Sequence, residues 1–209
     1  MSNQEEGLVR YKGSERLNHW LIAILFVFAA LGGLAMFHPS MFFLSGLFGG
    51  GSLTRVLHPF IGSAMFVLFV LIFFKFWHHN VLTANDRKWL GQIGDVLNKK
   101  HDRLPEVGRY NGGQKAAFWV MVLTMILLVV SGLAFWRPYF SHYFSVDVTR
   151  VAALVHAVSA WVLILTIITH VYAALWVKGT IGAMWTGVVS RAWARKHHPG
   201  WFKEVTGGK

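Results

Sequence analysis

Four histidines lie in or beside long apolar stretches of this chain, where ionisable side chains are rare. His156 and His170 lie in one such stretch, VHAVSAWVLILTIITH, which runs from position 155 to position 170. His19 and His58 lie where two earlier stretches begin, in the strings RLNHWL and RVLHPF. A neutral imidazole can bind a metal ion or relay a proton, and ionisable groups inside a membrane are costly and usually functional. These four side chains are therefore the first candidates for chemistry.

The elements that must position these histidines are membrane-spanning helices. Of the 209 residues, 55% are hydrophobic and 14% are charged, whereas soluble domains average about 25% charged residues. Four stretches are long enough to cross a hydrocarbon core, which takes about 20 apolar residues: 17–37, 56–76, 116–136 and 151–177. Only helices satisfy their own backbone there. The sequence therefore predicts an all-α membrane protein, a four-transmembrane-helix bundle that forms a single domain over residues 1–209.

The distribution of basic residues predicts how the bundle is oriented. Seventeen of the 20 lysines and arginines lie in the two terminal tails, in the 77–115 loop or at its edge, and the other three are Arg55, Arg137 and Arg150. By the positive-inside rule, both termini and the 77–115 loop are expected in the cytoplasm, with the chain multi-pass in a bacterial inner membrane. Contact with anionic membrane lipid explains the net charge of +11 without a nucleic-acid partner.

Two further segments are expected at the inner surface. Residues 86–100 alternate charged and apolar side chains, which predicts a short surface helix. The basic and aromatic string SRAWARKHHPGWFKE near the C-terminus predicts contact with lipid headgroups. The chain contains no cysteine, which excludes disulfides, thiolate zinc sites and cysteine-bound iron–sulfur clusters within it. The first apolar stretch has no evident cleavage site after it, so we expect no removable signal peptide.

Helical geometry sorts the four histidines into two pairs. His156 and His170 are 14 residues apart, which on a helix is about 40° short of four turns and a rise of about 21 Å. They share one helix face, with His156 outer and His170 inner. At matching depths, His58 is the expected partner of His156, and His19 of His170. Imidazole is a common axial ligand of haem iron, so the pattern predicts two b-type haems, each held by a histidine pair inside the bundle.

A proton relay and a zinc site are the alternatives to haem ligation for these histidines. A proton-relay transporter would need polar residues near the midplane, where all four stretches are almost purely apolar. A zinc site shared by both pairs is excluded because they are about 21 Å apart, and the stretches lack carboxylates. Small residues such as Gly32, Gly33, Gly62 and Gly132 would let helices or a flat macrocycle approach closely. The remaining histidines are interpreted as solvated surface groups: His38, His78, His79, His101, His142, His197 and His198.

Several strings resemble a known family, the cytochrome b (gamma) subunit of respiratory membrane-bound formate dehydrogenases. They stand in the same order over nearly the whole chain: VRY, ERLNHW, RVLHPF, FWHHN, GRYNGGQK, FWRPYF, HVYAALWVKGTI and WARKHHPGWFKE. Cytochrome b subunits of hydrogenases and of thiosulfate or polysulfide reductases are similar in their histidines and form the alternative. GRYNGGQK, FWRPYF and WARKHHP are more similar to the formate enzymes.

The resemblance implies a non-catalytic electron-transfer subunit of a larger complex. In that family, a periplasmic molybdenum- or tungsten-containing subunit oxidises formate, and an iron–sulfur subunit passes electrons to the membrane subunit. The complex is expected to form a higher oligomer of this heterotrimer. His58 and His156 match the ligands of the periplasmic-side haem b, and His19 and His170 match those of the cytoplasmic-side haem b.

The string RYNGGQK is the candidate site for a quinone, menaquinone or ubiquinone. It precedes the third apolar stretch at the expected depth of His19 and His170. Asn111 and Gln114 can donate hydrogen bonds to a quinone carbonyl, and Gly112 and Gly113 would let backbone amides approach the ring. Composition alone favours a plain helix start with Asn111 as its cap. The resemblance favours the quinone, since Asn111 and Gly113 match contacting residues of the family.

Overall fold

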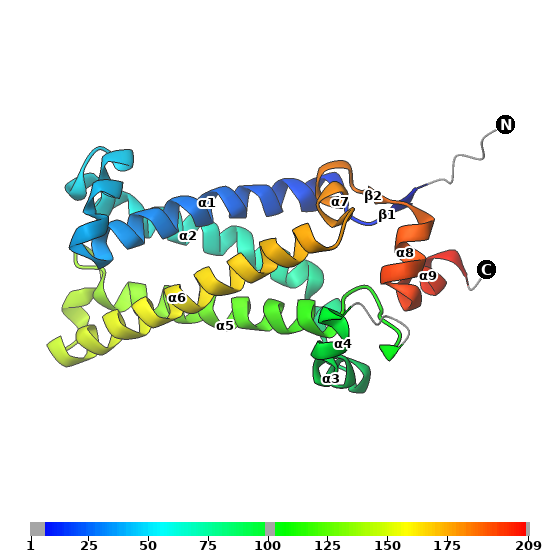
Figure 1. Cartoon of the computed structure of the whole chain (residues 1–209). Coiled ribbons are helices and arrows are strands. Elements are labelled where there is room, and N and C mark those ends of the chain that lie inside the picture. Colours follow the sequence, from blue (N-terminus) through cyan, green and yellow to red (C-terminus); the bar gives the residue numbers. More distant parts are fainter. Residues whose placement is uncertain (1–6, 99–102, 208–209) are drawn as a thin grey trace. The chain divides into compact units, whose positions relative to one another are not determined.

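The computed structural model describes residues 7–98 and 103–207. Within them, four helices are long and apolar enough to cross a membrane (Figure 1). They are α1 (Gly13–Phe37), α2 (Gly51–Phe76), α5 (Gly112–Phe135) and α6 (Val146–Trp176). Each contains one of the expected apolar stretches almost completely. The predicted fold, a helical membrane protein with four transmembrane helices, is confirmed.

The helices begin earlier than the apolar stretches do, because polar residues form their first turns. α2 starts at Gly51, five residues before the expected position 56, and Thr54 Oγ1 donates a hydrogen bond to Gly50 O at 2.9 Å. Gly50 has φ +104°, a left-handed value that glycine adopts readily. α6 starts at Val146 instead of 151, and Ser145 Oγ accepts from Val148 N at 3.4 Å. A hydropathy count omits such turns.

The described residues form two compact units. The bundle unit consists of Leu17–Phe74 and Val120–Ile168. The tail unit consists, among the described residues, of 7–16, 75–98, 103–119 and 169–207. Each long helix contributes residues to both units, so the single domain over residues 1–209 stays a prediction.

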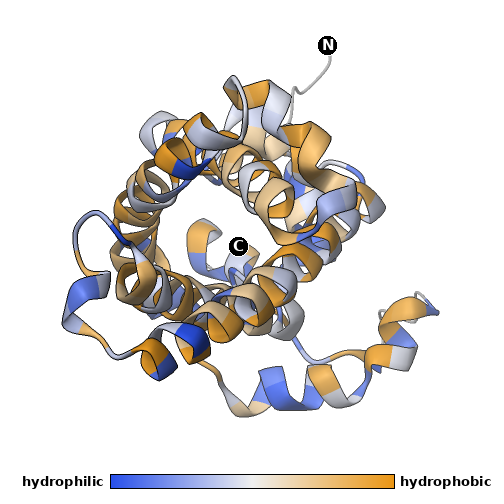
Figure 2. Ribbon diagram, turned by 90° about the vertical axis from the view of Figure 1, so that its left-hand side faces the viewer, coloured by the Kyte–Doolittle hydropathy of each residue, from blue (hydrophilic) through white to orange (hydrophobic). Residues whose placement is uncertain are grey.

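The core of the bundle unit takes one buried side chain from each long helix, namely Ala29, Met65, Met125 and Leu163. Hydrophobic residues predominate along these helices (Figure 2), as expected for helices that cross a membrane. η1 (Pro39–Phe48) connects α1 to α2, and η4 (Ser141–Tyr143) lies between α5 and α6.

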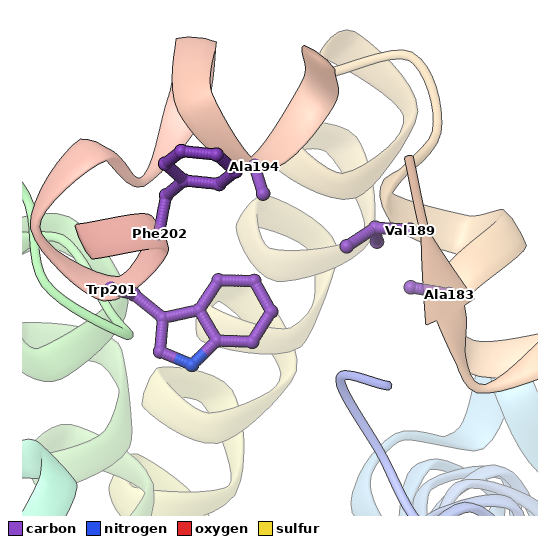
Figure 3. Packing of buried hydrophobic residues seen from close by; sticks show 5 residues of the cluster. All are labelled: Ala183, Val189, Ala194, Trp201 and Phe202. Carbon is purple, nitrogen blue, oxygen red and sulfur yellow. The ribbon is translucent and has the colours of Figure 1, made fainter. Parts of the chain in front are cut away.

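The tail unit has a small core of its own. β1 (Leu8–Val9) pairs antiparallel with β2 (Val188–Val189), with Leu8 opposite Val189. α7 (Thr180–Thr186), α8 (Arg191–His197) and α9 (Pro199–Thr206) complete this core. Figure 3 shows the rings of Trp201 and Phe202 on the side of α9 that faces the other labelled side chains. The buried set is Ala183, Val189, Ala194, Trp201 and Phe202.

Two sequence expectations about this unit are corrected. Trp201 is only 2% exposed and Phe202 only 6%, so these aromatic side chains pack inside the protein instead of contacting lipid headgroups.

The segment 86–100 forms two short helices, α3 (Ala84–Gly91) and α4 (Ile93–Leu97), not one. They are separated at Gln92, whose N–H bonds to Trp89 O at 3.1 Å and closes the last turn of α3. Lys99 and Lys100 lie outside the described residues. η2 (Trp77–Asn80) links α2 to this part of the chain.

Candidate cofactor site

His58 of α2 and His156 of α6 face each other within the bundle unit, as the matched depths predict. Their ring centres are 6.1 Å apart and their planes make an angle of 69°. Two metal–nitrogen bonds of about 2 Å, together with the distance from each nitrogen to its ring centre, span about 6 Å. Two imidazoles at this spacing could bind one metal ion between them.

The protein fixes the protonation of the His156 ring. Its Nδ1 lies 3.0 Å from Leu128 O and 3.2 Å from Ser131 Oγ. A backbone carbonyl can only accept, so Nδ1 carries the proton and Nε2 keeps its lone pair. Such a bond on the second nitrogen is how proteins orient a metal-binding histidine. Phe135 holds the same ring edge to face, with centres 5.2 Å apart.

Three glycines make room for these two rings. A Cβ built on Gly33 would lie 3.3 Å from His58 Cε1, and one on Gly32 would lie 3.5 Å from His58 Nδ1. A Cβ on Gly132 would lie 3.3 Å from His156 Cε1. A Cβ would thus be tight against the imidazoles at Gly33 and Gly132 and in ordinary contact at Gly32. Gly62 differs, because a Cβ there would meet nothing within 4 Å.

The other predicted pair falls on two different units. His19 is half-buried in the first part of α1, and its ring packs edge to face on Trp20, with centres 5.5 Å apart. His170 is an exposed residue near the end of α6 and belongs to the tail unit. The ligand role of both residues stays a prediction.

Asn111 and Gln114 form a reciprocal capping arrangement at the start of α5. Gln114 N donates to Asn111 Oδ1 at 2.8 Å, and Asn111 N donates to Gln114 Oε1 at 3.0 Å. This is a capping box built from two amides, so the helix-cap interpretation of Asn111 holds. Because the backbone donors require oxygen at both positions, each side-chain NH₂ group points elsewhere and can donate.

Gly112 and Gly113 pack against α3. A Cβ on Gly112 would lie 2.7 Å from Asp86 O, and one on Gly113 would lie 3.0 Å from the Trp89 ring. Gly112 is thus required for the contact between α5 and α3, and Gly113 makes that contact closer than a Cβ would easily allow. A role of Gly113 in contacting a quinone stays a prediction.

A buried ion pair that the sequence did not reveal holds the same junction. Lys115 Nζ donates to Asp86 Oδ2 at 2.7 Å and to Val81 O at 3.0 Å. Asp86 and Lys115 are 6% and 8% exposed. Burial by itself would raise the pKa of Asp86, but hydrogen bonds from Lys115 and Thr83 lower it below its usual value. Asp86 and Lys115 are 29 residues apart, and neither belongs to a recognisable motif.

The histidines interpreted as surface groups have mixed environments. His38, His78 and His142 are exposed, whereas His79 and His197 are half-buried. His101 lies outside the described residues. For His198 the interpretation is wrong: it is 4% exposed and bonded to Gly108 O and Arg10. The tail core that buries it forms only when distant segments meet, so local sequence could not show it.

Four apolar helices that carry a facing histidine pair define a membrane cytochrome b type of protein. The chain belongs to the prokaryotic cytochrome b561 family, whose sequence model matches residues 10–187.

Named relatives cover nearly the full chain. It is 45% identical, over 97% of its length and 95% of the relative's, to the formate dehydrogenase cytochrome b556(fdo) subunit of Escherichia coli K12. It is 42% identical, over 95% of its length and 91% of the relative's, to the nitrate-inducible cytochrome b556(Fdn) subunit of the same strain. It is 39% identical, over 94% of its length and 83% of the relative's, to the formate dehydrogenase cytochrome b556 subunit of Haemophilus influenzae. The resemblance drawn from the sequence strings is confirmed.

Proposed function

We propose that this chain is the membrane-anchoring cytochrome b subunit of a formate dehydrogenase and transfers electrons without oxidising a substrate itself. The observation that carries this proposal is the 45% identity over 97% of the chain to a protein of that name. The facing pair of His58 and His156 supports it, because two histidines close together inside a helical bundle could hold a haem iron.

Two haems b are the proposed cofactors, one held by His58 and His156 and one by His19 and His170. Bound haem b would supply a one-electron carrier. The residues of the first pair fit that group: the bond to Leu128 O leaves His156 Nε2 free, and the glycines beside the rings leave space for both imidazoles. The second pair rests on the helix spacing and on family membership.

Partner subunits supply what this chain lacks. Without cysteine, it cannot hold an iron–sulfur cluster by thiolates. Electrons are proposed to arrive from an iron–sulfur subunit on the periplasmic side, which receives them from a molybdenum- or tungsten-containing catalytic subunit. Entry is near His58 and His156, and exit is near His19 and His170. The complex is proposed to be a higher oligomer of the heterotrimer in the inner membrane, with both termini of this chain cytoplasmic.

A quinone, menaquinone or ubiquinone, is the proposed acceptor at the start of α5. The side-chain NH₂ groups of Asn111 and Gln114 are the donors proposed for its carbonyl, because their oxygens are already engaged in the capping box. Gly113 is proposed as a further contact. The quinone would take its protons from the cytoplasm at this end of α5.

Haem stoichiometry of the purified complex tests this function. With a tag on this chain, the complex should show formate-reducible haem b and two haems per chain by the pyridine haemochrome assay. His156→Leu should reduce the count to one, whereas His142→Leu, at an exposed residue, should keep both. A complex without haem, or a His156→Leu variant that retains both haems, would refute the proposal.

A further inference from the structure

Both terminal tails bind one irregular segment that leads into α5. Residues 105–108 have no regular secondary structure, yet the three successive carbonyls of residues 107–109 are each bonded by a tail residue. The donors and distances are Gly200 N to Val107 O at 2.9 Å, His198 Nδ1 to Gly108 O at 3.0 Å and Arg10 Nη2 to Arg109 O at 2.7 Å. The position of this segment thus depends on partners about 90 or more residues away in the sequence.

Arg10 is the centre of this arrangement. It is 3% exposed, and Arg109 Nη2 returns a hydrogen bond to Arg10 O at 2.6 Å. The Arg10 guanidinium also lies 4.7 Å from the centre of the Trp201 ring and 5.8 Å from that of Tyr110. The planar guanidinium group suits such stacking, and a lysine cannot replace its fork of donors.

His198 fits this arrangement in one tautomer only. Arg10 Nη2 lies 3.3 Å from His198 Nε2, and an arginine can only donate, so Nε2 is the acceptor. Nδ1 therefore carries the proton and donates to Gly108 O. The neutral ring links Arg10 to the backbone of the segment.

The last bonded carbonyl, that of Arg109, lies two residues before Asn111. On the other side of Asn111, the glycines pack against α3 and Lys115 is bonded to Asp86. The capping box is thus held from both sides, by the tails before it and by α3 after it. A shift of residues 107–110 would move Asn111 and turn its amide.

We propose that Arg10 and His198 are positioning residues for the quinone site, which hold Asn111 and Gln114 in place through the backbone of residues 107–110. This inference rests on the proposed function. It assigns to the two tails a role in quinone binding that Arg10 and His198 exert through the backbone, not by contact with the quinone.

The test measures quinone kinetics in the intact complex. Arg10→Met and His198→Leu should each raise the KM for a water-soluble quinone analogue at least tenfold, with smaller effects on kcat and with both haems still reduced by formate. His198→Asn, which keeps a donor near the position of Nδ1, should restore most of the affinity. Arg87→Met is the matched control, because Arg87 is an exposed residue of α3.

Two further measurements keep the outcomes distinct. If the Arg10→Met complex loses haem, the Arg10→Lys complex takes its place in the test. Lysine keeps the positive charge but lacks the planar set of N–H donors of the guanidinium group, so Arg10→Lys should still raise the KM for the quinone analogue. If the Arg10 and His198 variants that retain haem keep a KM within twofold of the parent value, the positioning role is refuted. The double variant Asn111→Leu, Gln114→Leu distinguishes failure of the quinone site from failure of the positioning role. Normal quinone turnover in this variant refutes the quinone site itself. Loss of turnover in this variant, together with an unchanged KM in the Arg10 variants, refutes only the positioning role.

Discussion

The imidazole of His156 has one nitrogen committed to the protein and one left for a ligand. The bond from Nδ1 to Leu128 O and the contact with Ser131 Oγ orient the ring toward His58. Gly132 lies on the same turn of α5 as Ser131, so one short segment both orients the ring and leaves room for it. The precision of this site therefore depends on small residues as much as on the ligands.

Gly132→Val should displace the His156 ring and remove the haem proposed for that pair. A Cβ alone would lie 3.3 Å from His156 Cε1, and valine adds two methyl groups that a stiff β-branched side chain cannot rotate away. The haemochrome assay should find about half the haem of the parent complex, on the two-haem proposal. Gly62→Val is the matched control, because a Cβ there meets nothing within 4 Å; equal haem in both variants would contradict the packing argument.

His198 should make the packing of the tails sensitive to acid. Burial, followed by the charge of Arg10, lowers the pKa of His198 from 6.5 to about 3. Folding thus favours the neutral ring. The contribution of His198 to the free energy of unfolding is therefore complete above pH 6.5 and is lost as the pH falls from 6.5 toward 3. At pH 5 the free energy of unfolding is lower by about 2 kcal/mol than at neutral pH.

The measurement is amide hydrogen exchange of residues 107–110 in the complex, compared at pH 7 and pH 5 after correction for the intrinsic rate. Protection should fall at pH 5 in the parent chain and change much less in His198→Asn, which cannot be protonated there. The exposed His142→Asn should behave as the parent. Equal pH dependence in the parent and in His198→Asn would contradict the assignment.

The start of α5 shows how short helices position longer ones. α3 is capped by Thr83 and Asp86, and the same Asp86 accepts from Lys115 of α5. Gly112 and Gly113 let the Trp89 ring lie directly on the first turn of α5. The buried pair and the glycines together fix α3 against α5.

Asp86→Asn should destabilise this junction, because it leaves Lys115 buried without its counter-charge. Breaking a buried pair on one side costs about 3–5 kcal/mol, so the midpoint of thermal unfolding of the complex should fall and exchange in α3 should rise. Removing both charges with Asp86→Leu and Lys115→Met should cost less.

The surface pair Lys203–Glu106 provides the comparison. Its side chains are 61% and 60% exposed, and such pairs contribute about 0–1 kcal/mol. Glu106→Gln should therefore leave the unfolding midpoint almost unchanged. An effect of Glu106→Gln as large as that of Asp86→Asn would show that burial does not set the strength of the pair.

The apolar stretches predicted the four long helices, because length and hydrophobicity determine a span almost alone. They missed the polar first turns at Gly51 and Val146, which contribute capping bonds but little hydropathy. The expected depths of the histidines in the membrane also predicted that His58 and His156 lie close together, as they do. It could not find the contact of Arg10 with His198, since these residues are 188 positions apart and lie outside any periodic pattern.

The orientation of the whole chain decides on which side a quinone takes its protons, and the sequence makes it directly measurable. Because the chain has no cysteine, a single introduced cysteine is its only thiol. Arg87→Cys and His142→Cys place that thiol at exposed positions in the 77–115 loop and in the loop between α5 and α6. Seventeen of the 20 basic residues lie in the two tails, in the 77–115 loop or at its edge. Because basic residues are enriched on the cytoplasmic side of membrane proteins, the loop that carries Arg87 is expected in the cytoplasm. A membrane-impermeant maleimide added to right-side-out vesicles should label His142→Cys and leave Arg87→Cys unlabelled until the vesicles are opened. The reverse pattern would place the start of α5, and with it Asn111 and Gln114, on the periplasmic side, and proton uptake from the cytoplasm would then be ruled out.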